Sequence, residues 1–425
     1  MSFLKGRRYR IKTSMLLCML LGCASPAAAK EPLSRQISVP LDYKHPGLGR
    51  AKLTYELGAP FDPRKRSVIV VADGQQFYVQ RGAAARLQRE LFGPGVNVVG
   101  LITRGTTPAF VKSALGRGGK ADWLRAWRIF DSSQWIEDVE SVRRAVAGKA
   151  QVMLYGRSGG AYLVHQYLAV HGDHVSRAFT QSPVNALIAR NLRIKLDQFW
   201  DSLGRTDPSL QPVLVNSLKL RPQERTRMLL ALQRQHFFVP QDQEAAERRR
   251  LIRAFASGDD ATYGQMVAKY QVNDVLKLLA SDDAIPETVR VFELIGPSGE
   301  FESPTAPVSP LIDPQKEFAA PLLLLEHARR IPAPGFDLGA AHRLTTEVFI
   351  LAARQDEAVD YRTSIALAYV YPRATLFIAN DNHTFIKLSA AGEDGRLLRA
   401  FFAGGIGSPA LNAELEGAES YRWRE

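Results

Sequence analysis

The sequence predicts an α/β fold in which a mostly parallel β-sheet is covered by helices on both faces and is interrupted by an inserted helical region. Three observations lead to this prediction. Short apolar runs alternate with helix-like segments between residues 36 and 183, and the same alternation returns after residue 346. The residues between these two regions carry long charged segments of helical periodicity and no convincing strand alternation. Alternating strands and helices are typical of a parallel sheet with helices on both sides.

The first region contains most of the expected strands. Residues 37–43 and 51–59 are typical of an antiparallel pair. The later runs are continuously apolar, as buried parallel strands are, and comprise residues 67–73, 96–102, 152–155 and 177–183. We expect crossover helices between them at residues 78–91, 135–146 and 161–170.

The second region completes the sheet after the insertion. Apolar runs at residues 347–353 and 374–380 predict two more buried strands, and helices are expected at residues 361–371 and 384–403. The residues after 403 are rich in glycine, alanine and glutamate and are expected to be loosely held. The predicted organisation is a core formed by residues 30–183 and 343–403, a helical cap at 184–342, and a C-terminal tail at 404–425.

The first 29 residues are predicted to be a secretory signal peptide rather than part of the fold. Five basic residues precede a short apolar stretch, residues 14–22, and small residues up to Ala29 supply a cleavage site. The apolar stretch is too short to span a bilayer stably. We therefore expect an exported protein, periplasmic or secreted. Residues 20–23 also resemble a bacterial lipobox, and lipidation of Cys23 would give a membrane-anchored lipoprotein instead.

Composition excludes several classes of chemistry and partner. Both cysteines, Cys18 and Cys23, lie in the leader, so the mature chain has neither a disulfide nor thiol chemistry. Removing the five leader cations from the formal charge of +12 leaves +7. Much of this excess lies between residues 221 and 253, where interspersed acidic residues indicate a solvated helix face. We therefore expect no nucleic-acid partner and no cofactor.

A short glycine-rich motif carries the strongest chemical signal. Residues 156–160 read Gly-Arg-Ser-Gly-Gly, a G-x-S-x-G pentapeptide with Ser158 at its centre. An apolar run precedes it and a helix-like segment follows. A strand, a sharp turn and a helix are the context in which this pentapeptide forms a nucleophile elbow, with the serine hydroxyl exposed at the turn. Ser158 is therefore the candidate nucleophile.

A serine nucleophile needs a base to take its proton and an acid to orient that base. Asp356 and His383 each lie three residues past a predicted strand of the second region, in the chain order serine, acid, histidine. The carboxyl ends of parallel strands meet at one edge of a sheet, which is where open α/β sheets collect their active sites. Glu357 and Asp381 remain alternative acids.

Other polar residues near these positions have simpler interpretations. Asp360 is expected to cap the helix that follows it. His171 and His174 are expected near the end of the helix after the elbow, where imidazoles suit the negative end of the helix dipole, rather than as metal ligands. We therefore expect no metal site.

Hydrolysis through a serine also needs two backbone donors for the oxyanion. One is expected to be the N–H of Gly159, directly after the nucleophile, and the other the N–H of Gln75, in the loop after the strand at residues 67–73.

These motifs together resemble the proline iminopeptidase and tripeptidyl-aminopeptidase group of α/β-hydrolases. The resemblance covers most of residues 36–400, is weak through the cap, and rests on VPLDY, Arg104-Gly105, DVESVR, LYGRSGGAYL, HVSRAFTQSP, Asp356 and His383. It implies an exported serine peptidase that cleaves peptide or amide bonds through an acyl-enzyme. An aminopeptidase must hold a protonated amino terminus, and a desolvated ammonium requires a partner. Glu293, Glu300 and Glu302 in the late cap are the candidates.

The chain also departs from this group. The usual His-Gly-Gly-Pro-Gly-like loop is replaced by Ala-Asp-Gly-Gln-Gln at residues 72–76, and Ile102-Thr103 stand where the group has an acidic-start motif. An Asp beside the oxyanion site disfavours negative charge unless it is turned away or paired. Two alternatives therefore stay open: an esterase, lipase or acyltransferase with the same triad, and a non-catalytic binding protein on the same scaffold.

Overall fold

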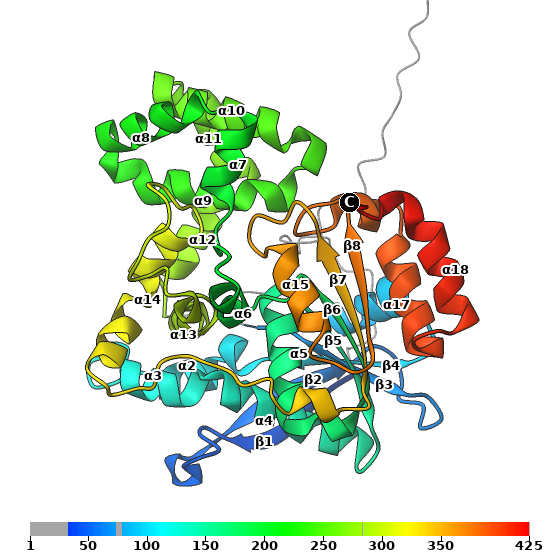
Figure 1. Cartoon of the computed structure of the whole chain (residues 1–425). Coiled ribbons are helices and arrows are strands. Elements are labelled where there is room, and N and C mark those ends of the chain that lie inside the picture. The colour runs from blue at the N-terminus through cyan, green and yellow to red at the C-terminus, as the bar shows by residue number, and fades with distance from the viewer. Residues whose placement is uncertain (1–32, 74–78, 283, 425) are drawn as a thin grey trace, which may run out of the picture.

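The computed structural model describes residues 33–73, 79–282 and 284–424. Eight strands form one sheet in the order β1-β2-β4-β3-β5-β6-β7-β8 (Figure 1). The pairs β1–β2 and β2–β4 are antiparallel, and every later pair is parallel. The strands are β1 (Leu33–Pro40), β2 (Arg50–Leu57), β3 (Ser67–Val71), β4 (Asn97–Ile102), β5 (Val152–Arg157), β6 (Val175–Gln181), β7 (Glu347–Ala353) and β8 (Ala374–Ala379).

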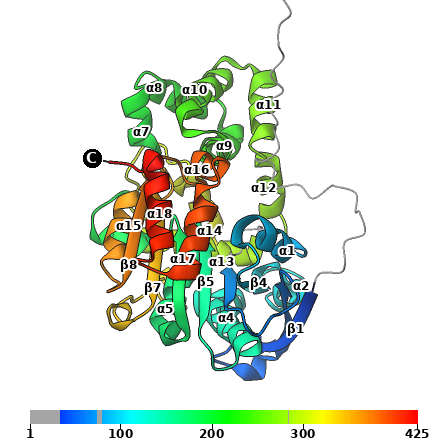
Figure 2. The same cartoon turned by 90° about the vertical axis from the view of Figure 1, so that its right-hand side faces the viewer.

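Apolar residues of the central strands supply both faces of the sheet, because successive side chains of a strand point to opposite sides. In β3, Ile69 and Val71 join one apolar cluster, whereas Val68 and Val70 join another. Helices α4 (Ser132–Ala147), α5 (Ser158–His171) and α15 (Tyr361–Ala368) cover the first face, and α17 (Glu393–Gly404) and α18 (Pro409–Gly417) cover the second (Figure 2). Shorter core helices are α1 (Ala83–Leu87), α2 (Pro108–Ser113), α3 (Trp123–Phe130) and α16 (Ile386–Ala390).

The C-terminal segment differs from the sequence prediction. Instead of a loosely held tail, it contains α18, whose Leu411 is buried against the second face of the sheet. The chain then adds a backbone hydrogen bond from Trp423 to Ile378 of β8. The prediction was wrong because the segment is rich in glycine and alanine and has only a few larger apolar residues to indicate that it packs on the sheet.

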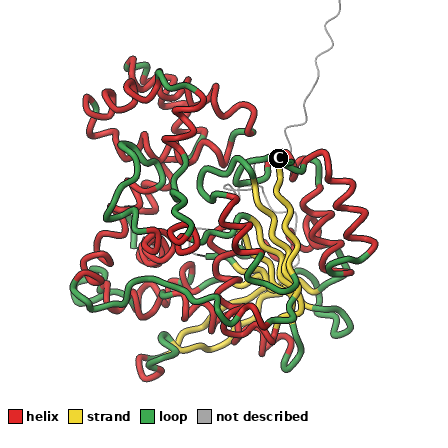
Figure 3. Tube along the Cα trace, viewed as in Figure 1, coloured by secondary structure: helices red, strands yellow, loops and turns green. Residues whose placement is uncertain are grey.

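The described part of the insertion between β6 and β7 consists of helices and loops without a strand (Figure 3). Its outer helices enclose an apolar core of their own and comprise α7 (Phe199–Thr206), α8 (Leu210–Leu220), α9 (Arg225–Phe238), α10 (Gln241–Ser257), α11 (Asp260–Lys269) and α12 (Val272–Leu279). Helices α13 (Ala284–Ile295) and α14 (Ile312–His327) instead share the apolar cluster of the first sheet face, and α6 (Ala186–Asn191) joins them. The cap therefore has an outer layer and an inner layer, and the inner layer is continuous with the core.

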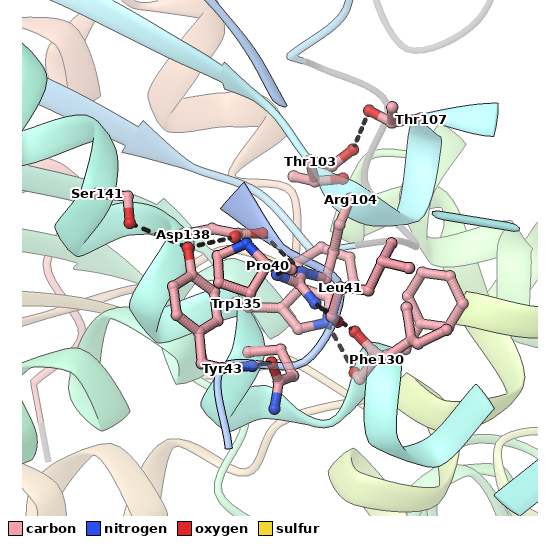
Figure 4. Close-up of polar contacts among 12 residues, drawn as sticks. Pro40, Leu41, Tyr43, Thr103, Arg104, Thr107, Phe130, Trp135, Asp138 and Ser141 are labelled. Carbon is pink, nitrogen blue, oxygen red and sulfur yellow. Dashed lines mark hydrogen bonds and ion pairs between the residues drawn. The ribbon is translucent and has the colours of Figure 1, made fainter. Parts of the chain in front are cut away.

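A buried arginine fixes the loops on which the inner cap rests. Arg104 is fully buried, and its Nε and Nη2 each donate to Asp138 at 2.7 Å (Figure 4). Its Nη1 donates to the carbonyls of Leu41 at 3.0 Å and Ile129 at 2.6 Å. A buried ion pair is stable only when its remaining polar atoms are also satisfied, and these carbonyls meet that need. Arg104 thereby joins β4 to α3, α4 and the end of β1.

The residue after this arginine brings helix α13 close to the sheet. A Cβ atom on Gly105 would lie 2.6 Å from the ring of Trp135 and 3.3 Å from Pro286 at the start of α13. Only a residue without a side chain permits this approach.

Among the described residues, no helix has both the length and the apolarity that crossing a bilayer requires.

Candidate active site

Ser158 lies at a sharp turn between strand β5, which ends at Arg157, and helix α5, which begins at Ser158 itself. Its φ of +50° is a conformation that non-glycine residues rarely adopt. A Cβ on Gly156 would lie 2.6 Å from the carbonyl oxygen of Gly160, so the strand and the helix can meet here only through a glycine. The structure thus forms the strand–turn–helix that the pentapeptide predicts, with a strained serine at its apex.

Asp356 and His383 meet as the sequence predicts. Asp356 follows β7, His383 follows β8, and the Oδ2 of Asp356 lies 2.7 Å from the Nδ1 of His383. The backbone N–H groups of Ala358 and Val359 donate to Oδ1 at 2.9 and 2.8 Å. Burial by itself would raise the pKa of Asp356, but the charge and hydrogen bond of His383 hold it below the ordinary value. An ionised Asp356 can therefore orient the imidazole and stabilise its protonated form.

The alternative acids have other partners. Both carboxylate oxygens of Glu357 accept from Arg248, at 2.7 and 2.8 Å. Asp381 accepts from backbone N–H groups of its own loop, including those of Lys387 and Leu388 at 2.9 Å. Asp360 caps α15, as expected. Asp356 is therefore the acid positioned at the imidazole.

The elbow and the histidine loop lie next to one another, but the last contact of a triad is not made. The guanidinium of Arg157 donates to the carbonyl of Thr384 at 3.5 Å, which joins the residue before Ser158 to the residue after His383. Among the described residues, no hydrogen bond links Ser158 to His383, whereas we expected His383 to face the serine. Catalytic hydrogen bonds are often long in free enzymes and shorten when substrate binds.

Two acidic side chains lie on the side of the site where oxyanion donors were predicted. Gly159 lies in the first turn of α5, whereas Gln75 lies outside the described residues. The carboxylate of Asp73 lies directly over Gly159, because a Cβ there would be 1.7 Å from its Oδ2. Glu287 of α13 is also buried. Burial, followed by the charge of Asp73, raises its pKa well above the ordinary value, although the charge of Arg290 acts in the opposite direction.

The three cap glutamates chosen from the sequence are engaged elsewhere. Glu293 pairs with Arg290 and accepts from the N–H of Ser132 at 2.7 Å. Glu300 accepts from the N–H of Leu196 at 2.5 Å, and Glu302 lies on the surface 3.7 Å from His327. The sequence analysis did not select Glu287. The available signal was an acidic residue within the apolar helix sequence IPETVRVFELI, three residues before an arginine.

The outer layer of the cap lies over the histidine. The ring of Phe237, at the end of α9, is 5.3 Å from the ring of His383, and that of His236 is 6.2 Å away. Burial lowers the pKa of His236 to about 4, so this second imidazole is neutral at physiological pH. The cap thereby shields His383 from water without adding a charge beside it.

Within the part of the chain that the structure describes, two groups of side chains have donor atoms spaced for a metal ion, and neither includes a residue of the candidate triad. One comprises Glu140, His171 and His174, and the other comprises Glu302, Glu326 and His327. The carboxylate of Glu140 already accepts from two arginines and from a tyrosine hydroxyl, which leaves it little attraction for a cation. The second group is largely exposed and distributed over a surface loop and the end of α14.

Glu244 of α10 leads to a prediction about pH. Burial, followed by the charge of Glu357, raises its pKa from 4.5 to about 8. Between these two values the folded state retains a proton that the unfolded state releases, so the free energy of unfolding falls as pH rises through this window. We expect Glu244→Gln to match the wild type near pH 4.5 and to exceed it in free energy of unfolding at pH 9 by on the order of 5 kcal/mol. Denaturant unfolding at both pH values measures this, and parallel pH profiles for the two proteins would contradict it.

The solved structures compared with this chain share little of its sequence. No family model matches the chain, and no curated protein matches it. Among solved structures, the chain is similar to a variant of the meta-cleavage product hydrolase CumD (14% identity, TM-score 0.43, 86% of this chain and 97% of that one). It is also similar to an esterase from Rhodococcus sp. (14% identity, TM-score 0.43, 87% of this chain and 98% of that one). A third similar structure is a membrane phospholipase A described as a bacterial virulence factor (15% identity, TM-score 0.42, 88% of each chain). The chain's own strand order, its elbow and the loops after β7 and β8 give it the α/β-hydrolase fold.

Proposed function

We propose that this protein is an exported serine hydrolase that cleaves peptide or amide bonds through an acyl-enzyme at Ser158. The observation that carries the proposal is the pairing of a buried, ionised Asp356 with His383 at 2.7 Å, beside a strained serine at the end of β5. In this proposal, His383 takes the proton of Ser158 as the serine attacks the carbonyl carbon. His383 then returns the proton to the leaving amine, and water repeats the sequence to release the acid.

The developing oxyanion is stabilised by the N–H of Gly159 and by a donor from the loop after β3. Gly159 lies in the first turn of α5, where the helix dipole favours negative charge. Asp73 opposes this effect, because its carboxylate rests on the same glycine. The site is therefore better suited to a substrate that brings a positive charge of its own.

A free amino terminus is the positive charge that we propose. A desolvated ammonium is costly unless carboxylates accept its hydrogen bonds, and Asp73 and Glu287 provide two near the nucleophile. Arg290, whose charge acts on Glu287, already pairs with Glu293. A bound ammonium would favour ionisation of Glu287 and so oppose the burial that raises the pKa of its carboxyl group. Glu287 thus replaces Glu293, Glu300 and Glu302 as the proposed ligand of the amine.

An esterase, lipase or acyltransferase is the second candidate, and the apolar groups near the triad favour it. Leu294 lies 3.2 Å from where a Cβ of Gly159 would be, and Phe237 lies against His383. Such surroundings suit an acyl chain, which needs no cation partner.

The two candidates predict different responses to acetylation. We expect the wild type to hydrolyse a peptide anilide at least about 100-fold faster, in kcat/KM, than its N-acetylated twin, because acetylation removes the cation that the carboxylates bind. We expect Glu287→Gln to lower kcat/KM for the free peptide by about 10- to 100-fold and to leave the acetylated one nearly unchanged.

Glu302→Gln is the matched control, because it makes the same change at an exposed cap residue and should alter neither rate. Equal rates on both peptides, or a strong preference for acyl esters, would favour the esterase. Absence of any turnover and of any reaction at Ser158 would favour the binding protein.

A further inference from the structure

One helix of the outer cap contacts both of the loops that carry the acid and the base. Arg248 of α10 donates to both carboxylate oxygens of Glu357, the residue after Asp356. One helical turn earlier, Glu244 accepts at 2.7 Å from the Nδ2 of Asn382, the residue before His383. Residues four apart lie on the same face of a helix, so α10 presents these two groups side by side.

The contacts are buried and continue into the apolar core of the outer cap. Arg248 is 3% exposed and Asn382 is fully buried. The same Nδ2 of Asn382 also lies 2.9 Å from the carbonyls of His236 and Val239, at the end of α9. Beyond Arg248, α10 continues into the apolar core of the outer cap through Leu251 and Phe255. A movement of α10 would therefore be transmitted to both loops.

Arg248 also separates two neighbouring carboxylates. Glu357 directly follows Asp356 in the chain, and its side chain is 11% exposed. While Arg248 binds both oxygens of Glu357, Asp356 accepts from the Nδ1–H of His383. Without the arginine, the Glu357 carboxylate would lose its ion-pair partner directly beside the acid.

We infer that α10 is a clamp that positions the triad, with Arg248 holding the acid loop and Asn382 tying the histidine loop to the cap. The inference rests on the proposed function for its catalytic meaning. The cap thereby becomes part of the catalytic framework as well as a cover for the substrate, and undocking it disables Asp356 and His383 together. Misplacing a catalytic group by about 1 Å costs on the order of 100-fold in rate.

The test compares two adjacent arginines of α10 in the full-length chain. Arg248→Gln removes the contact to Glu357. Arg249→Gln removes a contact of the same kind to Asp207, at 2.7 Å, that stays within the cap. Two quantities are measured for each variant. The first is the rate of inactivation by a fluorophosphonate, and the second is the low-field proton NMR resonance of the hydrogen bond between His383 Nδ1 and Asp356. Steady-state kcat and KM are added for whichever anilide or ester the wild type hydrolyses.

We expect Arg248→Gln to lower the inactivation rate and kcat by about 10- to 100-fold, with KM changed less than about threefold, and to shift or abolish the low-field resonance. Arg248→Lys should recover part of the loss, and Arg249→Gln should resemble the wild type. Asn382→Leu should reproduce the loss from the other loop. Should Arg248→Gln fail to fold, the double variant Arg248→Gln/Glu357→Gln removes the unpaired charge and is expected to stay slow.

Folded Arg248→Gln and Asn382→Leu proteins that keep wild-type inactivation rates and the wild-type resonance would overturn the clamp, even if Ser158 is the nucleophile. If the wild type itself does not react with the fluorophosphonate, the proposed function fails. The resonance then still decides whether α10 positions Asp356 and His383.

Discussion

Replacing Ser158 with alanine is expected to lower kcat by about 10⁵-fold or more, because the acyl-enzyme can no longer form. The residual rate would come from the oxyanion donors and from substrate binding alone. The fold should be retained, since alanine and serine tolerate a φ of +50° similarly and the hydroxyl makes no hydrogen bond among the described residues. Steady-state kinetics on the preferred substrate, with thermal unfolding as a check on folding, measures this.

Ser182→Ala is the comparison for this substitution, with a much smaller loss expected, because the Ser182 side chain only helps to hold the pKa of Asp356 low. Ser182 follows β6, the strand next to β5, is buried, and also has a positive φ, of +42°. Of the two strained serines, only Ser158 heads a helix directly after its strand. A loss of activity in Ser182→Ala as large as that in Ser158→Ala would contradict the choice of nucleophile.

The second large effect is expected at the acid. Asp356→Asn should lower kcat by about 10⁴-fold while changing KM little, because an amide neither fixes the required imidazole tautomer nor stabilises the imidazolium that forms. The backbone donors to Oδ1, from Ala358 and Val359, would still hold the side chain in place. The low-field resonance of His383 should disappear in the variant.

Asp360→Asn makes the same change four residues away and separates a catalytic effect from a structural one. Asp360 caps α15, and asparagine caps helices equally well. We expect its kcat to remain within about threefold of the wild type, since such an effect is below 1 kcal/mol. If Asp356→Asn were no slower than Asp360→Asn, Asp356 would not be the acid.

The sequence predicted those features that depend on local patterns. The elbow at Ser158 and the cap on Asp360 follow from residues close together in the chain. The pairing of Asp356 with His383 follows from their positions at the ends of two predicted strands. The continuous apolar runs likewise located the parallel strands, because burial on both faces leaves no room for polar alternation.

The features that escaped the sequence depend on contacts between distant segments. Glu293 and Glu287 lie on the same helix, α13. Only the packing of this helix decides that Glu293 binds Arg290 and Ser132, while Glu287 is buried where the charge of Asp73 raises its pKa. The division of the cap into two layers and the contact of Arg248 with Glu357 arise in the same way. The burial of α18 rests on isolated residues such as Leu411, too few to form a pattern.

The most direct test of the central claim is to locate the covalent adduct of a fluorophosphonate probe on the full-length protein by mass spectrometry. Because His383 activates a single serine, we expect one adduct per chain, on the peptide that contains Ser158, and no adduct on Ser158→Ala. Glu287→Gln should still be labelled, because the probe carries no amine. An adduct at another residue, labelling that persists in Ser158→Ala, or hydrolysis by a protein whose Ser158 does not react would contradict the assignment of Ser158 as the nucleophile.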